Sequence, residues 1–453
     1  MLYFFFSALI LISPALYNRF PLVFSDSGTY MASSFDLVPP LDRPLGYGLF
    51  MRIVSWKASM WLVVFFQGLL GSYLIFKSLR VLVRDAYVKP LHLLTIITLT
   101  LCSGLGWYAS QLMPDVFSGL LILTLFLLFE TELKNGSFYM YLVLFFFFVI
   151  THFSYLPLSL LLVAGFFIFY LRKGPAVKNL KTKTLLIVSI WFCALQFLML
   201  NNYRHGNGYK LSPSSNVFLA ARLSESGILG QYLNDNCEAH PSSLCTIKDS
   251  LPTSTADFLW SDKGPLARHH WDWKKADQEY APVINDILTQ PRYLKSFIGE
   301  SFKAGFVQLF QVDIGSGLTS YRENSAPYYP LRDHIKREMN EMLHAQQNTQ
   351  GLNFTFLNLL NYLVLCGSLA IVFLSWYFRM LTEPMKRLIL FVVAGIICNA
   401  FITASLANVY DRLQARVTWL LVYVAFICLV RSIAQLWKQY TSVNPDEKTA
   451  EKL

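Results

Sequence analysis

Residues 114–171 read PDVFSGLLILTLFLLFETELKNGSFYMYLVLFFFFVITHFSYLPLSLLLVAGFFIFYL and contain three long apolar runs, at 114–130, 139–154 and 156–171. A membrane-spanning helix needs about 20 mostly apolar residues, and these runs approach that length with few charges. The polar stretch THFSYLP, at 151–157, separates the last two runs. This part of the chain therefore predicts three successive membrane helices.

Similar runs occur on both sides of this stretch, and ten are predicted in all: 2–18, 58–76, 91–107, 114–130, 139–154, 156–171, 184–201, 355–378, 387–404 and 417–436. The chain is 54% hydrophobic and only 15% charged, whereas soluble domains carry about 25% charged residues. Its net charge of +10 lies in short clusters beside the apolar runs, which is typical of membrane orientation and not of nucleic-acid binding. We predict an all-α polytopic membrane protein with about ten transmembrane helices and no nucleic-acid partner.

The loops between these runs alternate in basic charge. Loop 77–90 has four Lys or Arg, loop 131–138 has one and loop 171–183 has five, whereas loops 106–113 and 151–157 have none. Loop 18–57 also has four, but it is the longest of the short loops. Basic loops favour the cytoplasm. We therefore predict that both termini are cytoplasmic and that residues 202–354 face the opposite side. In a bacterium these residues would be periplasmic and the spans would cross the inner membrane.

Four regions follow from this topology. We predict an N-terminal transmembrane module at 1–201, an external segment of mixed structure at 202–354, C-terminal transmembrane helices at 355–436, and a cytoplasmic tail at 437–453. The external segment lies between spans seven and eight and contains a helical stretch near 276–290 and an amphipathic stretch at 295–312.

Two features of the external segment concern its own structure. Cys237 and Cys245 can form a disulfide in an oxidising compartment. The cluster His269-His270-Trp271 with Trp273 contains rings that can stack on a sugar, although such clusters more often form the core or membrane contact of a small domain.

The first external loop contains a carboxylate and a guanidinium that can act together on a phosphate-linked substrate. Asp26 follows the apolar run 20–24, and Arg43 precedes Pro44 on a chain that cannot remain helical. A carboxylate near the membrane surface is a candidate functional residue. A carboxylate can take a proton from an acceptor hydroxyl while a guanidinium holds a departing phosphate. Alternatively, Asp26 caps a short helix.

Other candidates fall on the same predicted side. Asp115 begins a span, where a negative charge also favours the helix dipole, and His152 lies at an outer junction, where it can instead be a structural, hydrogen-bonded residue. Arg412 and Arg416 are four residues apart, so they share a helix face and can bind a lipid phosphate. They can instead form an interfacial charge cluster.

The elements Asp26-x-x-x-Tyr30 and Arg43-Pro-x-Gly-Tyr47, each beside a span, resemble the GT-C superfamily of membrane glycosyltransferases. They are most similar to the bacterial branch related to protein O-mannosyltransferases and aminoarabinose transferases. Met-Pro-Asp at 113–115 is similar to a proline-acidic element of the same group. These motifs cover about the first 100 residues of the chain.

The resemblance implies an inverting transfer of a sugar from a polyprenyl-phosphate carrier to a glycan, lipid or protein at the external face, with Asp26 as the catalytic carboxylate. The substrate- and phosphate-binding candidates are Arg43, Tyr30, Tyr47, His152, Arg412 and Arg416. The family commonly has a second acidic residue beside the first, whereas position 27 is Ser here. The second carboxylate is then Asp115 or Asp42, and a divalent cation (Mg or Mn) held by Asp26 and Asp115 stays an open alternative.

Two other functions compete with glycosyl transfer from a lipid phosphate. An oligosaccharide polymerase or ligase would use external arginines to bind a lipid pyrophosphate. A multi-span transporter or flippase would place its charges near mid-membrane and often contains internal repeats, neither of which is visible in the sequence.

Overall fold

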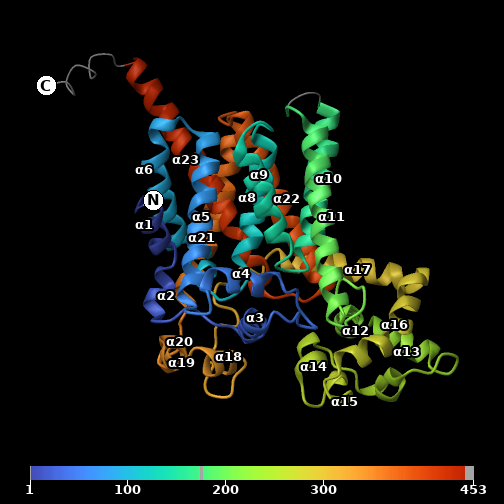
Figure 1. The fold of residues 1–453 in the computed structure, drawn as a ribbon. Helices are drawn as coiled ribbons and strands as arrows, with labels where there is room; N and C mark the ends of the chain where they lie inside the picture. The colour runs from blue at the N-terminus through green and yellow to red at the C-terminus, as the bar shows by residue number, and fades with distance from the viewer. Residues whose placement is uncertain (1, 174–176, 444–453) are drawn as a thin grey trace.

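The computed structural model describes residues 2–173 and 177–443. Within these ranges all regular secondary structure is helical, apart from one isolated β-bridge (Figure 1). The helices of the N-terminal half are α1 Leu2–Leu11, α2 Ser13–Asn18, α3 Ser25–Asp36, α4 Gly46–Ser55, α5 Trp61–Leu82, α6 Asp85–Cys102, α7 Leu105–Ala109, α8 Val116–Glu130, α9 Gly136–Val149, α10 Tyr155–Lys173 and α11 Leu180–Arg204. They are followed by α12 Ser215–Glu225, α13 Ile228–Asn236, η1 Ser243–Ser250, α14 Thr255–Trp260, α15 Pro265–Arg268, α16 Trp273–Thr289, α17 Pro291–Gln308, α18 Tyr328–His334, α19 Lys336–Leu343, α20 Gln346–Thr349, α21 Thr355–Tyr377, α22 Glu383–Leu406 and α23 Asp411–Val443.

Among the described residues, six helices are long and apolar enough to cross a membrane: α5, α10, α11, α21, α22 and α23. Helices α1, α8 and α9 are apolar but shorter. With 15 residues, α8 is about 22 Å long, less than the roughly 30 Å of a bilayer core. All ten predicted apolar runs overlap helices, but the count of ten membrane spans is not confirmed.

Helix α8 lies at the centre of the bundle. Its residues are apolar on every side, and all but Glu130 are buried. A helix that is hydrophobic all round is stable only when neighbours cover each face, and α5, α9, α10, α22 and α23 surround it. This position fixes the start of α8, and with it Asp115, at the middle of one end of the bundle.

Side-chain contacts separate the loops into two sets at opposite ends of the bundle (Figure 1). At one end Arg387 binds Glu130, and Lys183 donates to the carbonyl of Phe129. At the other end Gln308 bonds Tyr410, and Ser214 donates to the carbonyl of Leu41. Loop 171–183 and the start of α22, both rich in Lys and Arg, therefore lie opposite the long segment after α11, whereas loop 18–57, with four Lys or Arg, lies beside that segment.

The segment after α11 is helical, so the expectation of mixed structure was wrong. Its first part has a hydrophobic core of its own, built by α12–α16 and the start of α17. Helix α16 shows why: Tyr280, Val283, Ile284 and Ile287 recur at helical spacing and are buried on one face. Its 17 residues end at Thr289, and Pro291 begins α17, where its missing N–H costs no hydrogen bond.

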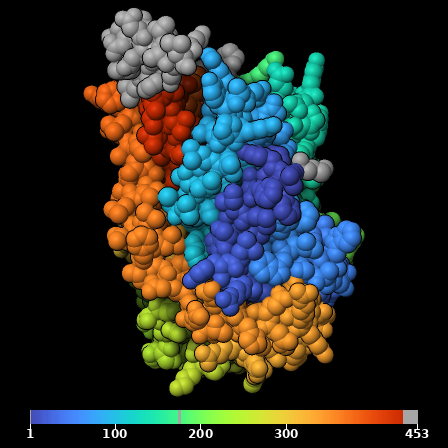
Figure 2. All heavy atoms as spheres, turned by 90° about the vertical axis from the view of Figure 1, so that its left-hand side faces the viewer, coloured from blue at the N-terminus to red at the C-terminus, as the bar shows by residue number. Residues whose placement is uncertain are grey.

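The last part of this segment belongs to the bundle. Leu331, Met342 and Ala345 are buried in the main core, and the amide of Gln347 bonds the backbone of Val23 in both directions. Figure 2 shows this part, in orange, covering the end of the N-terminal helices. The predicted region 202–354 is thus two structural parts, and the predicted tail 437–453 begins inside α23, with 444–453 outside the described residues.

Cys237 and Cys245 form a disulfide with their Cα atoms 5.8 Å apart. Closing a loop of eight residues stabilises a fold by about 2–3 kcal/mol through the unfolded chain. We expect Cys237→Ser to lower the unfolding free energy of the α12–α16 part by that amount. Thermal unfolding followed at Trp273 measures it, with the bundle cysteine Cys366→Ser as control. Equal effects of both substitutions would contradict this expectation.

Candidate functional site

The carboxylate of Asp26 bridges two arginines from distant parts of the chain. Oδ1 of Asp26 lies 2.6 Å from Nη2 of Arg43, and Oδ2 lies 3.2 Å from Nη1 of Arg412. The side chains of Asp26, Arg43 and Arg412 are 13%, 15% and 14% exposed, so they are partly accessible to solvent. This group, Asp26 with Arg43 and Arg412, is called the outer cluster below.

The start of α3 orients Asp26 toward these arginines. Phe24 precedes the helix, and the hydroxyl of Ser27, not the carboxylate of Asp26, accepts the N–H of Phe24. The ring of Phe24 also supports Arg412, whose guanidinium carbon lies 4.0 Å from the ring centroid. Asp26 is therefore free of the capping role that was its alternative interpretation.

The Arg-Pro-x-Gly-Tyr-Gly stretch positions Arg43 through close packing of α4. A Cβ atom at Gly46 would overlap the carbonyl of Ile150, and one at Gly48 would overlap the side chain of Ser33. Only glycine permits this approach of α4 to α3 and to the end of α9. The loop before α4 is thereby held against α3, and Arg43 lies over the ring of Tyr30.

Tyr30 and Tyr47 support the site from beneath. Both are buried, and their rings meet edge to face with centroids 5.0 Å apart. The hydroxyl of Tyr47 donates to Gln67 over 2.6 Å, and the Gln67 amide donates to the carbonyls of Ala109 and Gln111. Tyr30 thus supports Arg43 directly and Tyr47 supports Tyr30, and substrate binding by either tyrosine stays a prediction.

A second ion pair lies deeper in the bundle. Asp115, at the start of α8, accepts from Arg416 over 2.9 Å, and their side chains are 2% and 0% exposed. Arg416 also donates to Asn399 and to Ser154. Nε of Arg412 is 4.0 Å from Oδ2 of Asp115, so Arg412 connects this inner pair with the outer cluster.

His152 reaches the inner pair through one hydroxyl. Its Nδ1 accepts the backbone N–H of Ser154 and lies 2.8 Å from the hydroxyl oxygen of that residue, which accepts from Arg416. An Nδ1 that accepts a hydrogen bond belongs to a neutral imidazole. Burial, and then the charges of Arg416, Arg412 and Arg43, lower the pKa of His152 well below its ordinary value.

This neutral histidine predicts a pH dependence of stability. As the pH falls through about 6.5, an unfolded chain gains a proton at His152 while the folded protein does not. Stability present above that pH is therefore lost below it. We expect His152→Gln to flatten the fall in melting temperature between about pH 7 and pH 5. His205→Gln, at an exposed position, should leave the fall unchanged, and equal slopes for His152→Gln and the parent protein would contradict the account.

Arginine side chains bind most of the carboxylate oxygens of the site, and this limits how a divalent cation could bind to Asp26 and Asp115. Both oxygens of Asp26 and Oδ1 of Asp115 accept from arginine, which leaves only Oδ2 of Asp115, 4.0 Å from Nε of Arg412, without a hydrogen-bond donor. A divalent cation needs several such oxygens for itself. This arrangement therefore does not fit a cation bridging Asp26 and Asp115. In the part of the chain that is described, no group of three or more His, Cys, Asp or Glu could hold a metal ion.

Three buried polar atoms in and near the inner pair have no hydrogen-bond partner. Oδ2 of Asp115, Nε of Arg416 and the side-chain oxygen of Gln111 are buried and have no hydrogen-bond partner. Such atoms are costly in a folded protein unless something else satisfies them. The inner pair therefore carries polar atoms that the protein itself leaves without hydrogen bonds.

The structure brings together eight residues predicted from the sequence: Asp26, Tyr30, Arg43, Tyr47, Asp115, His152, Arg412 and Arg416. Sequence reasoning missed the supporting roles of Gln67 and Asn399. Each is a lone amide within an apolar helix, which was a usable signal because such groups need internal partners in a membrane. Asp42, the other candidate for a second carboxylate, contacts Arg43 over 3.3 Å.

Trp273 and His269 of the aromatic cluster pack against the core of the external segment, whereas His270 and Trp271 are exposed. Trp273 stacks on Phe218 and packs against Trp260, and His269 packs on Tyr280. These contacts favour the structural interpretation of the cluster over sugar stacking. Comparison with family models, curated proteins and solved structures found no match to this chain.

Proposed function

We propose that this protein transfers a sugar from a polyprenyl-phosphate donor to an acceptor hydroxyl, with inversion, at the end of the bundle that contains Asp26. One observation supports the proposal most: a partly exposed carboxylate is held between two guanidiniums on a membrane-embedded scaffold. A carboxylate supplies a general base, and paired arginines match the geometry of a phosphate.

A phosphate can replace the Asp26 carboxylate as the anion bound by Arg43 and Arg412. Arg43 and Arg412 each donate through terminal nitrogens to one carboxylate oxygen. A phosphate has more charge and more acceptor oxygens than a carboxylate, so it competes well for both guanidiniums. Donor binding would release Asp26 from its ion pairs and free it to act on the acceptor.

In the proposed step, Asp26 takes the proton of the acceptor hydroxyl. The acceptor oxygen then bonds to the anomeric carbon of the sugar from the face opposite the phosphate. The bond between that carbon and the phosphate oxygen breaks, and its electron pair leaves with the phosphate. Arg43 and Arg412 stabilise this growing negative charge, while the inner pair of Asp115 and Arg416 keeps Arg412 in place.

The membrane setting is part of the proposal. We infer a GT-C-like, multi-pass protein of the bacterial inner membrane with ten spans, both termini in the cytoplasm and residues 202–354 in the periplasm. Three observations support it: basic loops 77–90 and 171–183 lie at one end of the bundle (Figure 1), the outer cluster lies at the other, and Cys237 and Cys245 are bonded on that second side. The acceptor is a glycan, a lipid or a protein.

The presence of Arg412, Arg416 and His152 in one site also favours a second candidate, an oligosaccharide ligase or polymerase that holds a lipid pyrophosphate. That chemistry depends less on Asp26 than on the arginines. A transporter or flippase is less well supported, because the charges lie at one end of the bundle instead of along a path through it.

Reconstitution tests the proposal directly. The purified chain in nanodiscs would receive a polyprenyl-phosphate hexose and a membrane extract as the source of acceptor. We expect equal amounts of polyprenyl phosphate and glycosylated product, inverted anomeric configuration, and an unchanged rate in EDTA. Release of polyprenyl pyrophosphate would favour the ligase, and movement of the donor between leaflets without transfer would contradict the proposal.

A further inference from the structure

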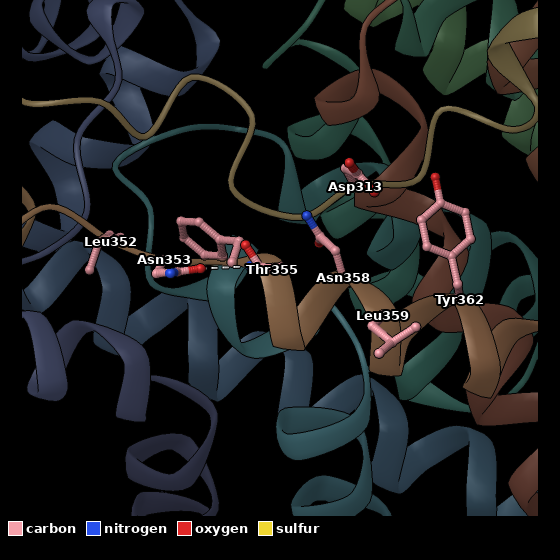
Figure 3. Close-up of a pocket in the computed structure, with 8 residues that line it drawn as sticks. Asp313, Leu352, Asn353, Thr355, Asn358, Leu359 and Tyr362 are labelled. Atoms are coloured by element: carbon pink, nitrogen blue, oxygen red, sulfur yellow. Dashed lines mark hydrogen bonds between the residues drawn. The ribbon is translucent and has the colours of Figure 1, made fainter.

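A pocket of about 600 Å³ lies beside the outer cluster, where the chain between α17 and α18 crosses the start of α21 (Figure 3). Its lining includes the polar side chains of Asp313, Asn353, Asn358 and Tyr362. Figure 3 shows the Tyr362 hydroxyl and the Asp313 carboxylate on the same rim, with Leu359 between Tyr362 and Asn358. None of these residues contributes to the proposed transfer step.

One layer of chain, residues 312–318, separates the pocket from the outer cluster. On the pocket side, the amide of Ile314 donates to Asn358. On the cluster side, the amide of Asp313 donates to Asp411, which directly precedes Arg412, and Gly317 packs against the ring of Phe24. A ligand in the pocket would therefore lie next to the phosphate-binding arginines without occupying them.

The lining defines the chemistry of the ligand. It includes one carboxylate, two amides and a phenol, and it contains no Lys or Arg, so it does not attract a phosphate. The carboxylate of Asp313 interacts with the Tyr362 hydroxyl on the pocket rim, and its Oδ1 has no hydrogen-bond partner within the protein. Side chains that both donate and accept hydrogen bonds, beside the apolar Phe354 and Leu359, are suited to a polyhydroxylated group.

An apolar surface continues from the pocket along α21. Phe356, Leu359 and Leu363 are 76%, 59% and 63% exposed on this helix, which is long and apolar enough to span a membrane. An acyl or prenyl chain can lie along these side chains while its headgroup enters the pocket. This continuity favours a lipid-borne group over a free sugar.

We propose that this pocket binds the hydroxyl-rich headgroup of a lipid, which is the acceptor of the transfer. The acceptor role depends on the proposed function, whereas headgroup binding does not. The carboxylate of Asp313, together with the Tyr362 hydroxyl, would bind one hydroxyl of the headgroup. A neighbouring hydroxyl of the same headgroup would extend past residues 312–318 toward Asp26.

Photolabelling of the full chain in nanodiscs tests headgroup binding without an activity assay. Three probes share a decyl chain with a diazirine and differ in their headgroup: β-D-glucoside, phosphate or ammonium. We expect the glucoside to label peptides from 350–365 most strongly, and Asp313→Asn to lower that labelling by about tenfold, as for loss of one charge-assisted hydrogen bond. Tyr362→Phe, which removes one hydroxyl, should lower it less, and Asp333→Asn at an exposed surface site should not change it.

Each other outcome has a definite meaning. Equal labelling by all three probes, or the strongest labelling by ammonium, would overturn the proposal. Competition by free methyl β-D-glucoside as strong as by the decyl glucoside would overturn the lipid-borne part. Asp26→Asn should retain full labelling. If Asp26→Asn loses transfer but the three probes label the protein equally, only the pocket proposal is rejected. If the glucoside labels selectively but the parent protein transfers no sugar, only the proposed function is rejected.

Discussion

Asp26→Asn should lower the rate of sugar transfer by about 10²–10⁴-fold, the usual contribution of a general base. The amide of asparagine has nearly the shape of the carboxylate but cannot take a proton from the acceptor. The loss should fall on kcat, because Arg43 and Arg412 remain to bind the donor phosphate. Initial rates of polyprenyl-phosphate release at saturating donor measure this effect.

Asp36→Asn provides the matched control on the same helix. Asp36 ends α3 and its carboxylate bonds the backbone of Val38, away from both arginines. An asparagine keeps that hydrogen bond, so the transfer rate should stay within about twofold of the parent protein. If Asp26→Asn and Asp36→Asn were equally active, Asp26 would not be the base, and the ligase alternative would gain support.

Breaking the inner pair should produce the largest loss of stability. In Asp115→Asn, the fully buried Arg416 keeps its charge without a carboxylate to balance it. Removing one partner of a buried ion pair typically costs about 3–5 kcal/mol. Replacing Arg416 by Met removes the close partner of Asp115, leaves it only Arg412 at 4.0 Å, and should cost a similar amount. Unfolding free energies in mixed micelles measure both effects.

The double variant Asp115→Asn with Arg416→Met tests whether the two residues act as a pair. It removes both charges, so its cost should be well below the sum of the single effects. Asp333→Asn, whose ion pair with Arg332 is exposed, should change stability by less than about 0.5 kcal/mol. Additive losses in the double variant would show that Asp115 and Arg416 are independent of each other.

The sequence predicted the helices well because apolar length is a local property. Each predicted run overlaps a helix, and short polar stretches such as 151–157 mark real breaks. Asp26, Asp115 and Arg412 meet because each directly precedes or begins a helix at the same end of the bundle, so topology alone brought the candidate site close together.

Tertiary contacts decided what the sequence left undetermined. The choice between capping and ion pairing at Asp26 depends on Arg412, which is 386 residues away. Gln347 joins residues 311–354 to the N-terminal part of the chain through hydrogen bonds with Val23 and Asn18, and no local sequence pattern indicates these bonds. The span count depends on how α1, α6, α8 and α9 sit in a bilayer, and helix length alone does not determine it.

The central claim is that Asp26 occupies the place of the donor phosphate until the donor binds. Titrating the parent protein and Asp26→Asn with polyprenyl phosphate in nanodiscs tests it most directly. Asparagine removes the internal anion that competes for Arg43 and Arg412, so the variant should bind polyprenyl phosphate severalfold more tightly although it transfers sugar far more slowly. Weaker or unchanged binding by Asp26→Asn would contradict the claim, because the arginines would then not be the phosphate site.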